Sequence, residues 1–349
     1  MLSSKFCKIF FVAIIVSSST VFAAEENPKN TKVVDDPAYT HAQRLVELEP
    51  GRRLNLYCIG KGSPTVIFDS GMGDDISAWA LVQPTISTHT RACSYDRAGL
   101  GFSDPGRRAG DSANIVDDLH RLLVAASVKP PYILVGHSYG GMNVRLYADQ
   151  HLDEVAGIVI VDSADEDWLE NGWKLEPTQP TFEQFYAKIE QGWQQDRDCV
   201  VAAEKGLVEG TNIYKRCVPD PDPRYSGAIN AVWQKQKRSA DHLRAVLSEE
   251  ESFRTTSEKQ VHAARRWYGN LPLIVLKSTL ITKLGSGETQ FHRDAINHLH
   301  LYIEDQMAAL STRGVVRIVP DSDHYIQMTQ PDAVNDAILE VLKEATQAK

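Results

Sequence analysis

The sequence lacks the patterns that mark nucleic-acid-binding and metal-binding proteins. Its 349 residues include 46 acidic and 37 basic side chains, a formal charge of −9, and no basic run offsets this excess. An acidic surface repels phosphate backbones, so we expect no nucleic-acid partner. No Cys-x-x-Cys pair and no His-Glu-x-x-His segment occurs, and zinc sites commonly use those spacings, so we expect no metal site. We interpret His298 and His300, two positions apart, as surface or packing residues, because that spacing does not share a helix face.

Long apolar runs are also missing once the N-terminal segment is set aside. No later segment approaches the roughly 18 apolar residues that a spanning helix needs, so we expect no stable membrane insertion. At the N-terminus, Lys5 and Lys8 precede an apolar stretch over 9–16, and Val21-Phe22-Ala23 offers a cleavage site. This pattern predicts a signal peptide over residues 1–23 and a secreted or periplasmic protein. A single N-terminal membrane anchor is the alternative. Losing two lysines would make the formal charge −11.

Cysteine is scarce. Of the five cysteines, Cys7 would leave with the signal peptide, and Cys58, Cys93, Cys199 and Cys217 would remain. In an oxidising compartment these four predict two disulfides with three possible connectivities. The alternative is four buried thiols, because free cysteine packs well in protein cores.

What the sequence does contain is a regular alternation of strand and helix. Its short β-branched runs from the third onward are continuously apolar, which is typical of parallel strands buried on both faces. The first two or three runs lie close enough together to form antiparallel hairpins. A helical spacing from Ile115 to Leu123 begins near the cap candidates Asp111 and Ser112. We predict an α/β fold with a mostly parallel eight-stranded sheet flanked by helices. The runs cover 45–48, 54–59, 65–68, 91–95, 132–135, 155–161, 273–276 and 315–319.

About a hundred residues interrupt this alternation and contain no convincing strand. Helical patterns occur at 182–193, 228–247 and 261–268, with a proline-punctuated loop at 219–223. We predict a helical lid over 163–270, inserted into a core formed by 24–162 and 271–349. Its aromatic side chains line an apolar substrate pocket or simply pack the lid onto the core. Of these side chains, Trp168 and Trp173 are the candidate substrate-binding residues, and the others are Phe182, Phe185, Tyr186 and Trp193.

The strongest motif is Gly136-His137-Ser138-Tyr139-Gly140, between an apolar strand and a helical run. In this context Gly-x-Ser-x-Gly forms a sharp elbow that exposes the serine at the edge of the sheet. Ser138 is therefore the candidate nucleophile. His324, in the loop after the last strand, is the candidate base. Backbone N–H groups of Tyr139 and of Met72, in the loop after the third strand, are the candidate oxyanion hole.

These motifs resemble those of the α/β-hydrolase fold family. Besides the elbow, the segment from Tyr95 to Ser103 resembles that family's Asp-Arg-x-Gly-x-Gly-x-Ser turn, and His324-Tyr325-Ile326 resembles its catalytic histidine loop. The resemblance covers the mature chain apart from the insertion. The family's strand order makes Cys58 and Cys93 sheet neighbours, so it implies a Cys58–Cys93 disulfide. That leaves Cys199–Cys217, both in the insertion, as the second pair.

The acid of the triad has more than one candidate. Most family members carry it after the strand that follows the lid, but here that strand runs into Lys277-Ser278-Thr279-Leu280, and the next carboxylate is Glu288. Some members instead place the acid after the strand that precedes the lid, which here ends at Asp162. We predict Asp162, with Glu288 and Asp165 as the alternatives.

Together these residues predict a secreted serine hydrolase that cleaves carboxylic esters or lactones through an acyl-enzyme intermediate, with no cofactor. A peptidase or a carbon–carbon bond hydrolase would use the same groups, and a non-catalytic binding protein on this scaffold is a further alternative. The expected partner is a small-molecule ester or lactone. The sequence carries no signal for an oligomeric state.

Overall fold

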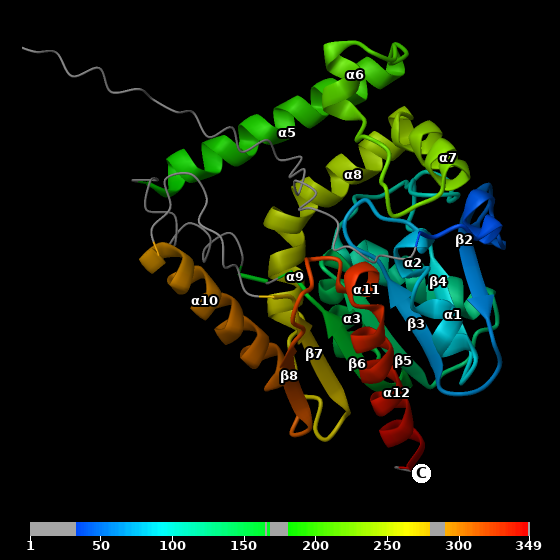
Figure 1. The fold of residues 1–349 in the computed structure, drawn as a ribbon, viewed down its shortest axis with the longest axis vertical. Coiled ribbons are helices and arrows are strands. Elements are labelled where there is room, and N and C mark those ends of the chain that lie inside the picture. Colours follow the sequence, from blue (N-terminus) through cyan, green and yellow to red (C-terminus); the bar gives the residue numbers. More distant parts are fainter. Residues whose placement is uncertain (1–32, 165, 168–180, 280–289, 348–349) are drawn as a thin grey trace, which may run out of the picture.

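The fold is built on one sheet of eight strands. The structure is a computed structural model that describes residues 33–164, 166–167, 181–279 and 290–347 (Figure 1). The strands lie in the order β1-β2-β4-β3-β5-β6-β7-β8. β1 and β2 form an antiparallel hairpin and β2 pairs antiparallel with β4, whereas all the other neighbours are parallel. The bounds are β1 Leu45–Glu49, β2 Arg52–Ile59, β3 Thr65–Asp69, β4 Ala92–Tyr95, β5 Tyr132–His137, β6 Val155–Val161, β7 Leu273–Lys277 and β8 Gly314–Ile318.

The predicted fold class is therefore confirmed, and the hairpin stops at the second strand. β3 lies inside the parallel part of the sheet, between β4 and β5. All five of its residues are buried, as expected of a strand covered on both faces.

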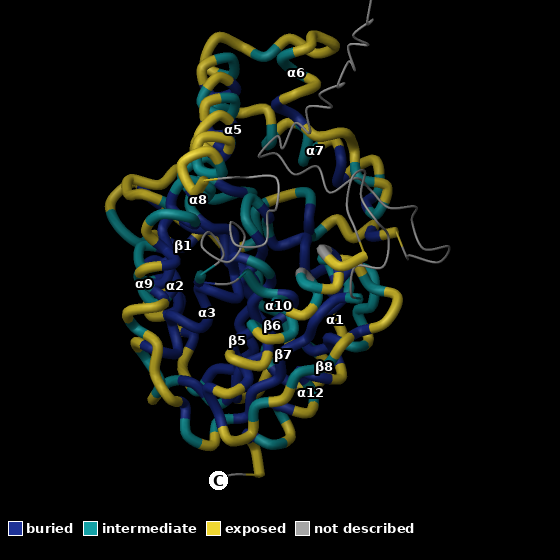
Figure 2. Tube along the Cα trace, turned by 90° about the vertical axis from the view of Figure 1, so that its left-hand side faces the viewer, coloured by how far each residue is buried: buried dark blue, intermediate teal, exposed yellow. Residues whose placement is uncertain are grey.

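Two apolar layers cover the faces of this sheet. One contains side chains of α2 (Ser112–Ala125), α3 (Tyr139–Gln150) and α10 (Gln290–Ala308). The other contains side chains around α1 (Gln83–Ser87), α11 (Ile326–Thr329) and α12 (Pro331–Gln347). Figure 2 shows the buried trace running between them. The cap of α2 is the predicted one, because the Asp111 carboxylate accepts a hydrogen bond from the N–H of Asn114.

Among the described residues, five α-helices and the short π-helix Phe253–Ser257 lie between β6 and β7, and we call the five α-helices the inserted helices. They are α5 (Phe182–Glu204), α6 (Asn212–Cys217), α7 (Gly227–Lys237), α8 (Ala240–Ser252) and α9 (Glu258–Ala264). α5 to α8 lie beyond one end of the sheet, away from the C-terminus (Figure 1). The single helix expected over 228–247 is two helices, because Ser239 caps the second one by accepting a hydrogen bond from the N–H of His242.

The aromatic side chains of α5 follow one face of that helix. Phe182 stacks on Tyr186, whose ring meets Trp193 edge-on, and Trp193 is buried. The signal-peptide segment, Trp168 and Trp173 lie outside the described residues.

Two disulfides link the four cysteines of the described residues in the expected pairs. Cys58 and Cys93 face each other across β2 and β4. Cys199 and Cys217 join α5 to α6 in a small apolar cluster that also contains Val218. Both bonds therefore tie together segments that already pack against each other.

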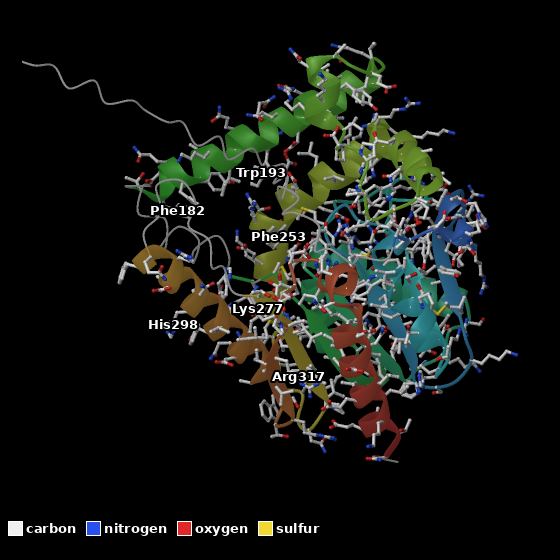
Figure 3. The ribbon with its side chains drawn as sticks, in the orientation of Figure 1. Phe182, Trp193, Phe253, Lys277, His298 and Arg317 are labelled. Carbon is white, nitrogen blue, oxygen red and sulfur yellow. A yellow bond between two sulfur atoms is a disulfide. The ribbon has the colours of Figure 1, made fainter. Side chains whose placement is uncertain are left out.

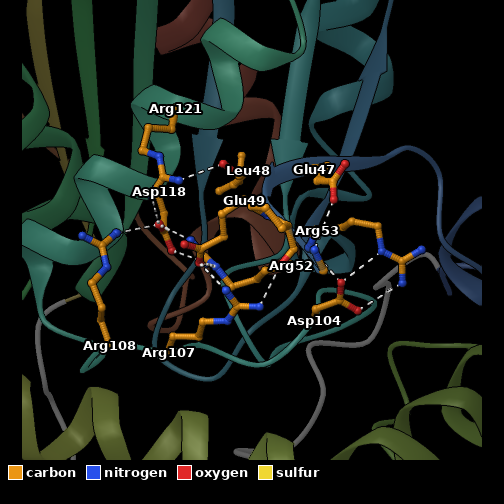
Figure 4. Close-up of polar contacts among 12 residues, drawn as sticks. Glu47, Leu48, Glu49, Arg52, Arg53, Asp104, Arg107, Arg108, Asp118 and Arg121 are labelled. Carbon is orange, nitrogen blue, oxygen red and sulfur yellow. Dashed lines mark hydrogen bonds and ion pairs between the residues drawn. The ribbon is translucent and has the colours of Figure 1, made fainter.

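Ion pairs fasten α2 to the β1–β2 hairpin (Figure 4). The buried guanidinium of Arg52 donates to both carboxylate oxygens of Asp118 at 2.8 Å and also pairs with Glu49. Arg108 and Arg121 approach the same Asp118 from the surface. Such bidentate contacts fix orientation as well as distance.

In the described part of the chain, no helix is both long and apolar enough to cross a bilayer.

Candidate active site

Ser138 occupies the turn between β5 and α3. Its φ of +53° and ψ of −119° lie in a region that non-glycine residues rarely adopt. Close packing accounts for the flanking glycines. A Cβ on Gly136 would lie 2.3 Å from the Gly140 carbonyl oxygen, and one on Gly140 would lie 2.3 Å from that of Asp69. The N–H of Ser138 donates to the Val161 carbonyl at 3.2 Å, which holds the elbow against β6.

Asp162 and His324 meet beside this elbow. Nδ1 of His324 donates to Oδ2 of Asp162 at 2.6 Å. Asp162 directly follows β6, next to β5 in the sheet, and His324 lies in the loop between β8 and α11. Nε2 of His137 lies 2.8 Å from the His324 carbonyl oxygen, and because a carbonyl only accepts, Nε2 is the donor. The residue that precedes Ser138 therefore holds the backbone of His324.

The carboxylate of Asp162 has a second set of donors. Its Oδ1 accepts from the ammonium of Lys277 at 2.5 Å and from the N–H of Ser278 at 3.0 Å. Burial would raise the pKa of Asp162, but the hydrogen bond from His324 and the positive charge of Lys277 outweigh it and hold that pKa well below its usual range. Asp162 is therefore ionised at neutral pH. Burial first, and the charge of His324 second, lower the pKa of His137 to about 3. His137 is therefore neutral at neutral pH.

Arg97 shapes the loop that carries Met72. The guanidinium of Arg97 donates to the carbonyl oxygens of Ser70 at 2.7 Å and of Gly71 at 2.6 Å. In a trans peptide the N–H points opposite to the carbonyl, so the amide of Met72 points away from Arg97. A Cβ on Gly140 would also lie 2.6 Å from the Ser70 carbonyl oxygen, so this loop lies directly against the elbow.

An inserted helix also contributes to this loop. Glu249 of α8 accepts from Nε of Arg97 at 2.6 Å and from the N–H of Gly73 at 2.9 Å, and Asp69 accepts from Nη1 of Arg97 at 2.9 Å. Arg97, Asp69 and Glu249 are all buried. The Met72 loop is thus held between the core and α8.

The second amide of the expected oxyanion hole is at the start of α3. Tyr139 is the first residue of this helix, and first-turn N–H groups have no intrahelical partner. The partial positive charge of a helix N-terminus favours a developing oxyanion at this position.

Five of the expected site residues therefore gather at one edge of the sheet: Ser138, His324, Asp162, Met72 and Tyr139. The alternative acids Glu288 and Asp165, like Trp168 and Trp173, lie outside the described residues.

Lys277 and Glu249 are among the site residues that the sequence did not predict. Lys277 carried a signal, because it ends the strand next to the one that Asp162 follows. Glu249 carried none, because its partner Arg97 lies 152 positions away.

One group of side chains in the described part of the chain has ligand types that suit a metal ion. Ligand atoms of His120, His151 and Glu154 lie within 4.8 Å of one another. The two imidazoles stack in parallel with centroids 4.3 Å apart, so their lone pairs run side by side and do not converge. The length of α3, about 18 Å at 1.5 Å per residue, separates this group from Ser138, so the group lies far from the candidate active site.

Comparisons with known proteins agree with this architecture. The model of the alpha/beta hydrolase family matches residues 66–337. A variant of a Pseudomonas aeruginosa protein classed as an epoxide hydrolase superposes with a TM-score of 0.63 at 18% identity, covering 90% of this chain and 99% of that one. An esterase from Thermogutta terrifontis superposes with a TM-score of 0.52 at 18% identity, covering 84% and 94%. At these identities the likeness shows the fold alone.

Curated relatives match only a segment of the chain. A 2-hydroxymuconate semialdehyde hydrolase from Pseudomonas sp. (strain CF600) is 31% identical over 118 residues, which is 33% of this chain and 41% of that protein. The chain spans less than half the length of the curated relatives that it matches.

Proposed function

Because the chain belongs to the alpha/beta hydrolase family, we propose that it is a serine hydrolase that cleaves carboxylic esters or lactones. The observation that carries the proposal is the 2.6 Å hydrogen bond between His324 and an ionised Asp162, beside a serine on a strained elbow. A serine hydroxyl is a weak nucleophile without a base, and this pair is the arrangement that supplies one.

The mechanism follows from these positions. Oγ of Ser138 attacks the carbonyl carbon while His324 takes its proton. The amides of Met72 and Tyr139 bind the oxyanion, and each such donor is worth about 2.7–4 kcal/mol in comparable sites. His324 then protonates the leaving alcohol, and a water molecule that it activates releases the acid. Asp162 keeps the proton of His324 on Nδ1 and stabilises the imidazolium that forms.

The nucleophile separates this proposal from two related chemistries. The epoxide hydrolases and haloalkane dehalogenases of the family use an aspartate at the elbow, and this chain has Ser138 there. Carbon–carbon bond hydrolysis is the second candidate, and the match to the semialdehyde hydrolase favours it. A peptidase would use the same groups, and a non-catalytic binding protein is the alternative outside enzymes.

Two further parts of the proposal concern the rest of the chain. Residues 163–270 would act as a lid that excludes water and selects substrates, a role supported by the contacts of Glu249 with Arg97 and Gly73. Replacing Trp168 or Trp173 with alanine should then change the preference among esters more than the melting temperature. Residues 1–23 would direct export, and the two disulfides support an oxidising destination.

A substrate screen tests the proposed reaction. Purified protein would be assayed with p-nitrophenyl esters of several acyl lengths, lactones, peptide amides and a vinylogous 1,5-diketone, with Ser138→Ala as the control. We expect turnover of esters or lactones that Ser138→Ala abolishes. Turnover of the diketone or the amides alone would favour the competing hydrolases. No turnover and no labelling by a fluorophosphonate would favour the binding protein.

A further inference from the structure

A lysine lies directly against the proposed triad. Lys277 is the last residue of β7, near the centre of the molecule in Figure 3. The register of β6 and β7 pairs Val161 with Leu276, so the next residues, Asp162 and Lys277, lie side by side. The side chain of Lys277 is only 11% exposed, and its ammonium lies 2.5 Å from Oδ1 of Asp162.

The carboxylate of Asp162 is therefore shared between two groups. Oδ2 accepts from His324, and Oδ1 accepts from Lys277. A carboxylate without a cation would stabilise a protonated His324 with its full charge. A carboxylate paired with an ammonium has little net charge, and at this burial the pair is weakly screened by solvent.

We propose that Lys277 is a positioning residue of the triad. Its ammonium fixes the Asp162 carboxylate that faces His324, and its positive charge opposes protonation of His324. The role in catalysis rests on the proposed function. The effect of Lys277 on the protonation of His324 does not, because it follows from the three side chains alone.

The other titratable groups around this cluster do not supply the same charge. His300 of α10 lies close enough to Lys277 for burial first, and the ammonium second, to lower the pKa of His300 to about 4. His137, at the end of β5, is neutral in the same range. The charge of Arg224 lies near enough to His137 to lower the pKa of His137, but Arg224 forms an ion pair with Asp222. Lys277 is therefore the cation that contacts the carboxylate of Asp162 among the described residues.

The sign of the effect follows from these charges. Protonation of His324 removes the base, so it sets the acidic limb of the activity profile. A nearby positive charge disfavours that protonation and moves the limb to lower pH. Neutralising Lys277 should move the acidic limb to higher pH by about one unit, the scale expected of one nearby charge in a partly screened site.

The test compares variants that remove or keep this charge. Lys277→Gln and Lys277→Met remove it, with and without a polar side chain, and Lys277→Arg keeps it. Lys215→Gln removes one charge from the exposed surface of α6 as a matched control. The readout is kcat/KM against pH for the best substrate of the screen. We expect the acidic limb to move up by about one unit in both neutral variants and to stay in place in Lys277→Arg and Lys215→Gln.

A second readout needs no substrate. In the Ser138→Ala background, titration of the His324 ring protons by NMR should give the same upward movement in Lys277→Gln or Lys277→Met, whichever folds by circular dichroism. An unchanged titration in a folded neutral variant would overturn the proposal, and so would an equal movement in Lys277→Arg. The NMR result stands even if no ester is turned over, so failure of the proposed function and failure of this inference are distinguishable.

Discussion

At the scale of single residues, the site combines backbone strain with buried charge. A positive φ at a non-glycine residue costs on the order of 1–3 kcal/mol and persists only where the surroundings impose it. Ser138 and Asp162 both have positive φ, +53° and +42°. The Ser138 and Asp162 amides each donate to a neighbouring strand, to Val161 and Leu276 respectively. The sheet thus fixes the proposed nucleophile and the proposed acid through their backbones.

Removing the charge of Asp162 is the prediction that belongs to this scale. Asp162→Asn would keep the shape of the side chain but favour the wrong tautomer of His324. We expect kcat to fall by about 10⁴-fold, as it does when the orienting carboxylate of other triads is lost. Steady-state kinetics on the variant, with its fold verified by circular dichroism, measures this. Glu288→Gln, at the alternative acid, should keep kcat near that of the wild type. The reverse outcome would place the acid after β7.

At the scale of elements, the sequence predicts what is local and misses what joins distant segments. Strand ends are predicted well because turn residues follow each apolar run. The break between α7 and α8 was not predicted. Ser239 caps α8 there, but the helical spacing of the apolar residues is otherwise continuous and hides the break. The candidate triad was predictable because Ser138 and Asp162 directly follow recognisable strands and His324 lies in the loop after the last one. The contact of Glu249 with Arg97 was not, because only the packing of α8 brings it to the Met72 loop.

That contact yields a prediction for α8. Glu249→Gln would weaken the hold on Arg97 and on the N–H of Gly73, and the Met72 amide would lose its fixed direction. We expect kcat to fall by about tenfold or more, because small displacements of a preorganised donor are costly.

The matched control for this variant lies on the same helix. Glu251 pairs with Arg197 at the surface, and surface pairs contribute little to stability, so Glu251→Gln should leave kcat unchanged. Equal kcat values in the two variants would mean that α8 does not position the Met72 loop.

At the scale of the whole molecule, buried ionisable groups make stability depend on pH. His242 of α8 is buried. Burial first, and the charge of Lys237 second, lower the pKa of His242 to about 3. Between that value and the ordinary value near 6.5, the unfolded chain binds a proton that the folded chain does not. The contribution of neutral His242 to stability is therefore present at neutral pH and is lost as pH falls from about 6.5 towards 3.

A urea titration at two pH values tests this. His242→Gln cannot gain the proton, so the free energy of unfolding of the wild type, taken relative to this variant, should fall by about 2 kcal/mol between pH 7 and pH 5. A difference that stays constant across that range would show that His242 takes up its proton as readily in the folded protein as in the unfolded chain. The comparison with the variant removes the opposing contribution of buried carboxyls such as Asp96. Burial first, and the charge of Asp75 second, raise the pKa of Asp96 to about 7.

Covalent labelling gives a direct test of the proposed activation of Ser138 by His324 and Asp162. Intact-mass and peptide spectra would be recorded after incubation of wild type, Ser138→Ala and His324→Ala with a fluorophosphonate. We expect one adduct on the wild type, mapped to the peptide that contains Ser138, none on Ser138→Ala, and labelling of His324→Ala that is slower by orders of magnitude. An unlabelled wild type, or an adduct that persists on Ser138→Ala, would contradict it.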